Sequence, residues 1–285
     1  MSATVSDLAR ARDQAGEVVA AEELGGGLVE LGVRLPHLAA TARPGEFAQL
    51  RCGPGPVPLL RRPMSVARVD GDRCAFVFER VGVGTRLLAA MRPGDRLDVL
   101  GPLGIGFTLP PAARRVLCVA GGLGCAPFPL TAAHALAAGV SEVVVLHGAA
   151  TASRLYPAQR LRGGNPRVRV VEATDDGSRG HHGLVTELVA AEVDAGVDAV
   201  LACGPNPMLA ALAAVLDGLH GVPAVVEASL EAPMGCGFGT CLGCALPVHD
   251  GAGAAWALCC REGPVMDVQR VDWAALQRLP AAQVA

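Results

Sequence analysis

Four cysteines near the carboxyl end restrict what this chain can fold into more than any other feature. Cys236, Cys241, Cys244 and Cys260 follow the spacing C-x4-C-x2-C-x15-C, and glycines occupy alternate positions over 235–239. Glycine lets a backbone wrap closely around an inorganic group, and this is the spacing of plant-type iron–sulfur ligands. The segment therefore predicts a 2Fe-2S cluster held by the four thiolates.

Two alternatives stay open within this segment. Cys259 and Cys260 are adjacent, and only one is needed as the fourth ligand; Cys260 is preferred because it opens the turn-rich sequence Cys-Arg-Glu-Gly-Pro. A structural zinc site is the second alternative. Such sites usually contain two short Cys/His pairs, whereas here only Cys241 and Cys244 form one, so the pattern favours a cluster.

Composition places the chain among redox proteins of a reducing compartment. Its 285 residues, 51% of them hydrophobic, exceed a typical single domain. The other six of the ten cysteines are scattered, and no basic-then-apolar leader follows Met1, so we expect the cytoplasm. A net charge of −3 and 3% aromatic residues argue against nucleic acid. Glycines and prolines interrupt the least charged stretch, 116–133, so no membrane span is expected.

Three styles of sequence predict three domains. Short β-like runs separated by Gly and Pro turns predict a flavin-binding β-barrel over 15–108. After the linker Leu-Pro-Pro-Ala, alternating strands and helices predict an α/β domain with a parallel sheet over 112–228. The alternation then fades into the cysteine segment, which predicts a small cluster domain over 229–285. About fifteen residues at the start are expected to fray. The expected α/β strands are 115–120, 142–147, 167–172 and 199–203, with helices at 127–138, 186–192 and 206–219.

Two short motifs in the barrel outline a flavin dinucleotide site. Arg62 and Ser65 flank the rigid Pro63, which suits an anionic cofactor lying along a strand. Further on, Gly82-Val83-Gly84-Thr85 precedes an apolar pair, as at a helix N-terminus whose free N–H groups and Thr85 hydroxyl cradle phosphates. Each motif alone is usually a turn or a cap, and their ordered occurrence together predicts FAD.

Two strand ends in the α/β domain predict a nicotinamide nucleotide site. One is a glycine turn with Gly121, Gly122 and Gly124 after an apolar strand; it departs from the strict G-x-G-x-x-G pattern and on its own equally fits a tight connection. The other is Cys203-Gly204-Pro205, with Asn206 as the expected N-cap and Pro207 at the first helical position. Asp175 and Asp176 suit ribose hydroxyls, although an Asp-Gly turn is the commoner explanation, and His181 and His182 are interpreted as surface residues.

From Glu17 onward the chain resembles the ferredoxin–NADP reductase superfamily, most closely the electron-transfer subunit of NAD-linked (class 1B) dihydroorotate dehydrogenase. The resemblance rests on these motifs, on Asp98–Gly104 and on the residues that flank the cysteines, Ser229–Glu231 and Cys260–Val265. The chain departs from the family at Met64, where many members have an aromatic residue, at the helix start Phe128-Pro129, and in the additional Cys259.

The resemblance implies an electron relay. FAD would lie between the barrel and the α/β domain, and the cluster between FAD and a partner catalytic subunit that carries FMN, as a heterotetramer of two of each. Electrons from dihydroorotate would pass through FMN, cluster and FAD to NAD+, in pyrimidine biosynthesis. The implied FAD contacts are Arg62, Pro63, Met64, Ser65, Val77, Phe78, Glu79, Gly84 and Thr85. The implied NAD contacts are Gly121, Gly122, Gly124, Cys203, Gly204 and Pro205.

Two rival interpretations are kept. One is the reductase subunit of a sulfide dehydrogenase, a hydrogenase or a bifurcating ferredoxin–NADP complex, which share this architecture and differ mainly in partner. The other is a non-catalytic, zinc-stabilised nucleotide sensor. The sequence also leaves NAD against NADP open, because Arg154, Arg160 or Arg179 would each suit a 2′-phosphate.

Overall fold

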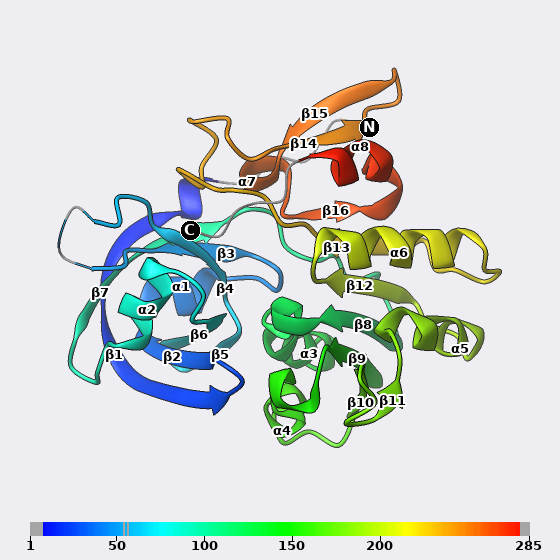
Figure 1. Ribbon diagram of the computed structural model, residues 1–285, viewed down its shortest axis with the longest axis horizontal. Helices are drawn as coiled ribbons and strands as arrows, with labels where there is room; N and C mark the ends of the chain where they lie inside the picture. The colour runs from blue at the N-terminus through cyan, green and yellow to red at the C-terminus, as the bar shows by residue number, and fades with distance from the viewer. Residues whose placement is uncertain (1–7, 54, 56, 280–285) are drawn as a thin grey trace.

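The computed structural model describes residues 8–53, 55 and 57–279 and divides them into three regions (Figure 1). An antiparallel half-barrel is followed by a mostly parallel α/β sheet and then by a small region that carries the cysteines. This arrangement confirms the predicted fold class.

The half-barrel is one seven-stranded sheet in the order β4-β3-β7-β1-β2-β6-β5. Its two edge strands are consecutive in the chain: Val66 N donates to Glu46 O at 3.2 Å, and Ala67 N then donates to Ala75 O at 2.9 Å. This change of partner curls the sheet around a core of alternating inward residues. Its elements are β1 Arg12–Gly25, β2 Leu28–Arg34, α1 Pro36–Thr41, β3 Phe47–Leu50, β4 Arg62–Ser65, β5 Arg68–Asp70, β6 Arg73–Glu79, α2 Val83–Ala89 and β7 Arg96–Leu103.

The amino-terminal residues depart from the prediction. Leu8–Arg10 form a 3₁₀ turn, and β1 begins at Arg12, whose Cα pairs with that of Gly101 in β7. Fraying is therefore wrong for residues 8–15: Ala11 N donates to Leu8 O across the turn, and residues 12–15 pair with β7. Residues 1–7 lie outside the described residues.

The α/β sheet has the order β11-β10-β9-β8-β12-β13-β16, and neighbouring strands are parallel except for β13 and β16 (Val265–Asp267), which pair antiparallel. β8 comes first in the chain, yet β9 lies on one side of it and β12 on the other. The strand order therefore reverses at β8, and the carboxyl ends of β8 and β12 flank the crevice where such sheets bind nucleotides. Its elements are β8 Arg115–Gly121, α3 Phe128–Ala137, β9 Glu142–Ala149, α4 Ala158–Arg162, β10 Val168–Thr174, β11 His181–His182, α5 Val189–Asp194, β12 Ala199–Cys203, α6 Asn206–Asp217 and β13 Val225–Ser229.

Two cores cover the faces of this sheet. Phe128 of α3 and Leu161 of α4 pack on one face, and residues of α5 and α6 such as Val189 and Leu212 pack on the other. β12 has the bounds predicted for it, 199–203. The predicted helix 186–192 is instead a 3₁₀ turn over Val185–Leu188 followed by α5.

The cysteine region joins the two larger domains. β16 pairs antiparallel with β13 and so extends the α/β sheet. Ile105 N, just beyond β7, donates to Gly263 O at 2.6 Å, and Leu230 N donates to Pro264 O at 2.9 Å. The region consists of a two-stranded hairpin and short helices: β14 Ala245–His249, β15 Ala254–Leu258, α7 Cys259–Glu262, β16 Val265–Asp267 and α8 Trp273–Arg278.

A buried carboxylate locks the half-barrel onto the α/β domain. Glu30 of β2 is 5% exposed and accepts hydrogen bonds from Tyr156 Oη at 2.7 Å, Arg160 Nη1 at 2.9 Å and Arg68 Nη2 at 2.7 Å. Charge-assisted bonds of this kind, away from water, fix the relative orientation of two domains.

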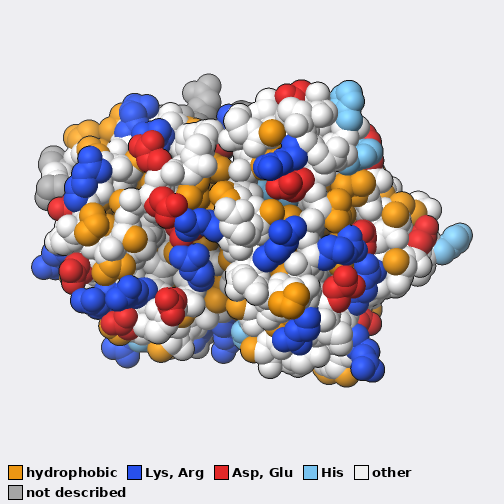
Figure 2. Space-filling model, turned by 90° about the horizontal axis from the view of Figure 1, so that it is seen from below, with side chains coloured by type: hydrophobic (Ala, Val, Ile, Leu, Met, Phe, Trp, Pro, Cys, Tyr) orange, Lys and Arg blue, Asp and Glu red, His pale blue; other side chains and the backbone are white. Residues whose placement is uncertain are grey.

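Charged side chains of both signs alternate over the face shown in Figure 2. Among the described residues, several charged side chains form ion pairs, as Arg115 does with Glu142 and Glu192. Within 8–279, leaving out residues 54 and 56, no helix combines the length and the apolar character needed to cross a membrane.

Candidate functional site

The four predicted cluster cysteines form two pairs in space. Cys244 and Cys260 are buried, and their sulfur atoms are 3.2 Å apart. Cys236 and Cys241 lie toward the surface, and the N–H group of Cys241 donates to the Cys236 sulfur. The N–H group of Gly239, from the first part of the loop, reaches the sulfur of Cys260, so the two pairs lie in one nest of backbone.

Backbone N–H groups point at three of these sulfurs. Burial raises the pKa of Cys236, but N–H donors from Cys241, Phe238 and Thr240 outweigh it and hold this pKa at about 6. The contact with the Cys260 thiol, together with the N–H groups of Cys260 and Cys259, lowers the pKa of Cys244 to about 6 despite burial, and the same contact raises the pKa of Cys260. The backbone N–H donors favour thiolate, the form that binds iron.

The loop from Cys236 to Cys244 adopts backbone conformations that favour glycine. Gly237 and Gly239 have φ of +84° and +90°. Leu242 also has a positive φ, +61°, although it is not glycine, and its side chain is 62% exposed. A non-glycine residue held in this region carries strain, which is often found at functional sites.

Cys259 points away from this nest. It is fully buried among the apolar residues under the hairpin, where its sulfur lies 3.5 Å from Leu230 O, and burial raises its pKa. The structure thus favours Cys260 as the fourth ligand, as the sequence did.

This donor set fits a two-iron cluster better than a zinc ion. A structural zinc ion needs four ligands around one point. The four cysteines instead form two pairs, Cys244 with Cys260 and Cys236 with Cys241. Two thiol pairs surrounded by N–H donors are what two bridged irons require.

In the half-barrel, β4 lies near β6. β2 pairs with β6 along its whole length, whereas β5 pairs only with Arg73–Ala75, so among the described residues no strand pairs with that second edge of β6 beyond Ala75. Arg62 of β4 and the start of α2 meet here: a Cβ added to Gly84 would lie 2.8 Å from Arg62 Nε. The two predicted phosphate-binding motifs are therefore adjacent.

Some predicted FAD residues act differently from the expectation. The Thr85 hydroxyl accepts hydrogen bonds from Val81 N and Gly82 N and donates to Gly82 O, so it holds the turn rather than pointing free. The side chains of Val77 and Phe78 are buried in the two cores, so they can meet a cofactor only through their backbone. Glu79 binds Arg154 Nη2 at 2.7 Å. Pro63, Met64 and Ser65 of β4 are half-buried.

The predicted nicotinamide turns lie side by side at the carboxyl ends of β8 and β12. Cys203 pairs with Ala120 across these strands. A Cβ on Gly124 would lie 2.1 Å from Cys203 O, and one on Gly121 would lie 2.3 Å from Met208 Sδ. Gly121 and Gly124 are thus needed for contact between the turns, and Gly122 takes φ of +54°. Gly204 and Pro205 complete the edge, which lies where sheets of this topology bind nucleotides.

The role predicted for Asn206 is wrong by one position. Pro205 is the N-cap of α6, Asn206 is its first residue and Pro207 its second. The Asn206 side chain instead binds Glu231, donating from Nδ2 to its O at 3.0 Å and accepting from its N at 3.2 Å. This link ties the nicotinamide edge to the segment that leads into the cysteine loop.

Sequence reasoning missed two groups at this edge. His147 of β9 is fully buried beneath the glycine turn, with Nε2 3.2 Å from Gly122 O and no partner in the described structure for Nδ1. Burial lowers the pKa of His147 to about 4, so it is neutral at pH 7. The Glu231 side chain is solvent-accessible, yet the surrounding protein desolvates its carboxylate and raises its pKa.

The candidate 2′-phosphate arginines all have carboxylate partners. Arg154 binds Glu79, Arg160 binds Glu30 and Glu22, and Arg179 lies 3.5 Å from Glu172. Asp176 accepts from the Ser178 backbone and hydroxyl, as in an ordinary turn, and His181 pairs with Glu187 at 2.8 Å. None of these interactions marks a site for a 2′-phosphate.

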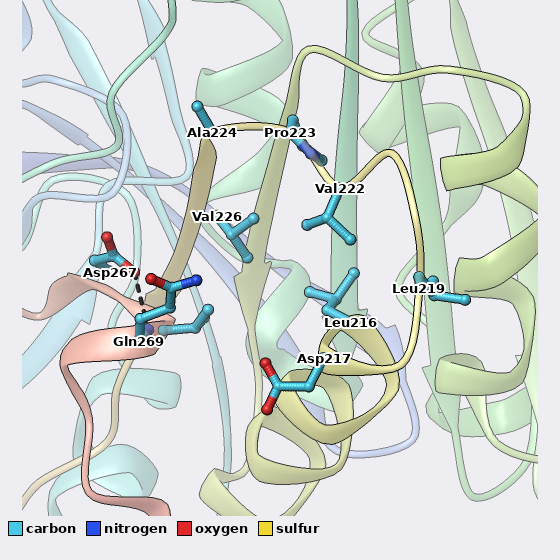
Figure 3. A pocket seen from close by; sticks show the side chains of 10 residues that line it. Leu216, Asp217, Leu219, Val222, Pro223, Ala224, Val226, Asp267 and Gln269 are labelled. Carbon is cyan, nitrogen blue, oxygen red and sulfur yellow. Dashed lines mark hydrogen bonds between the residues drawn. The ribbon is translucent and has the colours of Figure 1, made fainter.

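A surface pocket of about 480 Å³ lies away from these sites (Figure 3). It is at the amino end of β13, opposite the nucleotide edge. Its lining combines aliphatic side chains with two carboxylates and an amide: Leu216, Asp217, Leu219, Val222, Pro223, Ala224, Val226, Asp267, Val268 and Gln269. It contains no predicted site residue, and we assign no ligand to it.

Family models match two parts of the chain. The iron-sulfur cluster binding domain of dihydroorotate dehydrogenase B matches residues 231–272, and the oxidoreductase NAD-binding domain matches residues 118–214.

Full-length relatives agree with these matches. The chain is 38% identical over 241 residues to the "Dihydroorotate dehydrogenase B (NAD(+)), electron transfer subunit" of Desulforamulus reducens, covering 84% of this chain and 90% of that protein. It is 40% identical over 232 residues to the protein of the same name in Geobacillus thermodenitrificans, covering 80% and 86%. Among solved structures, one from a study of flavin-based electron bifurcation by an NADH-dependent reduced ferredoxin–NADP oxidoreductase aligns with a TM-score of 0.78, 26% identity and 92% and 91% coverage.

Proposed function

Because the chain belongs to the family of dihydroorotate dehydrogenase B electron-transfer subunits, we propose that it passes electrons from a partner's oxidation of dihydroorotate to NAD+, using a 2Fe-2S cluster and FAD. The observation that carries the proposal is the position of the cysteine loop. It is anchored both to the half-barrel, through Ile105, and to the nicotinamide edge, through Asn206 and Glu231.

The proposed cluster ligands are Cys236, Cys241, Cys244 and Cys260. The N–H groups around them stabilise negative charge on sulfur, and Gly237 and Gly239 let the backbone close over the site. When bound, the cluster supplies one-electron transfer and FAD converts between single electrons and a hydride.

The proposed FAD site lies along β4 and the later part of β6. Arg62 would neutralise the pyrophosphate, and Thr85 keeps the turn before α2 in the form that presents its N–H groups. Ser65, at the end of β4, would offer its hydroxyl or N–H group to the flavin. The backbone of Val77, Phe78 and Glu79, together with Pro63, Met64 and Gly84, would complete the site.

The proposed NAD site is the edge formed by Gly121, Gly122, Gly124, Cys203, Gly204 and Pro205. At the glycines of the two turns, no side chain would separate the backbone from a bound nucleotide. Because Arg154, Arg160 and Arg179 are engaged by carboxylates, the surroundings favour NAD over NADP.

The proposed partner is a catalytic subunit that carries FMN, in a heterotetramer of two of each. The names of the relatives support a partner, since they describe subunits. The docking surface we propose is the cysteine loop at Phe238, Cys241 and Leu242, where apolar side chains 39% and 62% exposed flank an exposed ligand. Such a patch is typical of an interaction site, and it lets the partner approach the cluster closely.

The cytoplasm and the division into 15–108, 112–228 and 229–285 remain part of this proposal. The ten cysteines, all of which lie in the described residues, form no disulfide, which supports a reducing compartment. The matched residues 118–214 and 231–272 support the second and third domains.

Reconstitution tests the function. The chain is combined with an FMN-containing dihydroorotate dehydrogenase catalytic subunit, and dihydroorotate-dependent reduction of NAD+ is followed. We expect coupled formation of orotate and NADH. A stable complex without coupled activity would contradict the assignment.

A reductase subunit of a bifurcating ferredoxin–NADP complex is the second candidate. The solved structure from the bifurcation study favours it, with a TM-score of 0.78. Its sequence identity to this chain is 26%, however, against 38–40% for the dihydroorotate dehydrogenase subunits. NADH-driven reduction of ferredoxin by the chain and its partner, with no response to dihydroorotate, would select this candidate.

A further inference from the structure

Gln49 of β3 has a fully buried side chain whose two polar atoms lack a partner. It is 0% exposed, and neither Nε2 nor Oε1 has a hydrogen-bond partner within the described part of the chain. A buried amide without partners is unfavourable, and native proteins rarely tolerate one unless a ligand or water completes it. Gln49 therefore marks a place where something binds.

The amide faces the cysteine loop, not the barrel core. Ala48 and Leu50, its neighbours in β3, point into the core of the half-barrel, so Gln49 lies on the outer face. Leu100 of β7 pairs with Gln49 and packs with the core beneath the cysteine region. A Cβ added to Gly237 would lie 2.6 Å from Gln49 Nε2, so the amide touches the residue that follows Cys236.

Gln49 is also next to the proposed flavin strand. It pairs with Pro63 of β4, in the middle of the motif that ends at Ser65. One side chain thus connects the strand beside the flavin with the loop that holds the first cysteine. The loop directs its own N–H groups at the Cys236 sulfur from Phe238, Thr240 and Cys241, and Gln49 approaches from the barrel.

We propose that the Gln49 amide donates a hydrogen bond to a sulfur atom of the cluster held at Cys236, and so raises the reduction potential of the cluster. This deepens the proposed function and rests on its cluster. A donor to sulfur stabilises the reduced form, which carries more negative charge, and hydrogen bonds to sulfur are among the factors that set this potential. Gln49 is a positioning residue that adjusts the potential difference between cluster and flavin.

The test is an EPR-monitored redox titration of the holoprotein with Gln49→Met, which keeps the length of the side chain and removes the donor. At a fixed applied potential, the ratio of reduced to oxidised cluster falls threefold to tenfold, and tenfold corresponds to about 59 mV for one electron. The matched control is Gln14→Met. Gln14 also has a buried Nε2 without a partner in the described residues, but it pairs with Val99, a core residue, and so lies on the other face of the sheet. The control leaves this ratio unchanged.

An unchanged cluster potential in Gln49→Met would overturn the inference, as would a shift in the flavin potential alone. If that variant does not fold, pulsed EPR of the wild-type reduced cluster with 15N-labelled glutamine side chains decides. A coupled glutamine nitrogen supports the inference, and its absence overturns it. Failure of the proposed function is distinct, because a chain that binds no cluster gives no EPR signal in any of these samples.

Discussion

Cys244 and Cys260 place their sulfur atoms 3.2 Å apart in the buried part of the cysteine loop, while Cys259 points into the apolar core. Cys259 and Cys260, adjacent in α7, therefore have opposite roles. Cys260 completes the proposed cluster site, and Cys259 fills space beneath it.

The first prediction separates these two cysteines. Cys260→Ser removes a ligand and abolishes stoichiometric cluster binding, whereas Cys259→Ala retains the cluster and loses only packing, about 1 kcal/mol of stability. Iron and sulfide content per protein, after anaerobic purification, measures the difference. Retention of a full cluster by Cys260→Ser together with its loss in Cys259→Ala would reverse the assignment.

The second prediction concerns the contact between the nicotinamide turns. In Gly124→Ala the added Cβ would lie 2.1 Å from Cys203 O, so the turns must move apart. Overpacking of this kind costs about 1–3 kcal/mol. We expect a lower melting temperature and a roughly tenfold rise in the KM for NADH in ferricyanide reduction.

Gly218→Ala is the control for that variant. At the end of α6 an added Cβ meets only Val215 O, at 3.5 Å, and φ is −89°. It leaves stability and the KM for NADH nearly unchanged. Equal behaviour of the two variants would show that the contact between the turns does not matter.

The third prediction concerns docking of the catalytic subunit. Leu242→Gly suits the positive φ of this residue, so the loop and its cluster are retained. It removes an exposed apolar side chain, and we expect the Kd for the catalytic subunit to rise about tenfold, or about 1.4 kcal/mol. Leu184→Ala, at an exposed leucine of the α/β domain, is the control. A change confined to Leu184→Ala would place the interface elsewhere.

How far the sequence predicted this molecule depended on whether the signal was local. β12 and α3 were predicted from apolar runs and turn residues, and the cysteine spacing identified the loop because ligand spacing is a local property. The contact of Gln49 with Gly237, and that of Tyr156 with Glu30, join segments distant in the chain. Their signal was only a glutamine in an apolar strand and a tyrosine before a short helix.

The roles of Asn206 and Thr85 show a second limit. Both have the residue type expected at a helix start, yet Asn206 binds Glu231 and the Thr85 hydroxyl binds its own turn. Residue type predicted that these side chains would make polar contacts. Only packing determined which partners they took.

The fourth prediction is a dependence of stability on pH through His147. Its pKa is about 4 in the folded protein, against 6.5 as its ordinary value, so protons bind the unfolded chain preferentially between these values. The stabilisation is complete above pH 6.5 and is lost as pH falls toward 4. Between pH 7.5 and 5.5 this amounts to about 1 kcal/mol.

Urea unfolding at the two pH values measures that loss. In His147→Leu this contribution to the pH dependence disappears, whereas in His134→Ala, a change at an exposed position of α3, it persists. An identical pH dependence in wild type and His147→Leu would contradict the assignment.

The most direct test of the central claim is to add NADH to the anaerobically purified chain and follow its visible spectrum together with low-temperature EPR. If the chain relays electrons between NAD, FAD and a 2Fe-2S cluster, the flavin absorption bleaches and the signal of a reduced 2Fe-2S cluster appears. A colourless, EPR-silent protein that contains zinc, once cluster loss during purification is excluded, would contradict it.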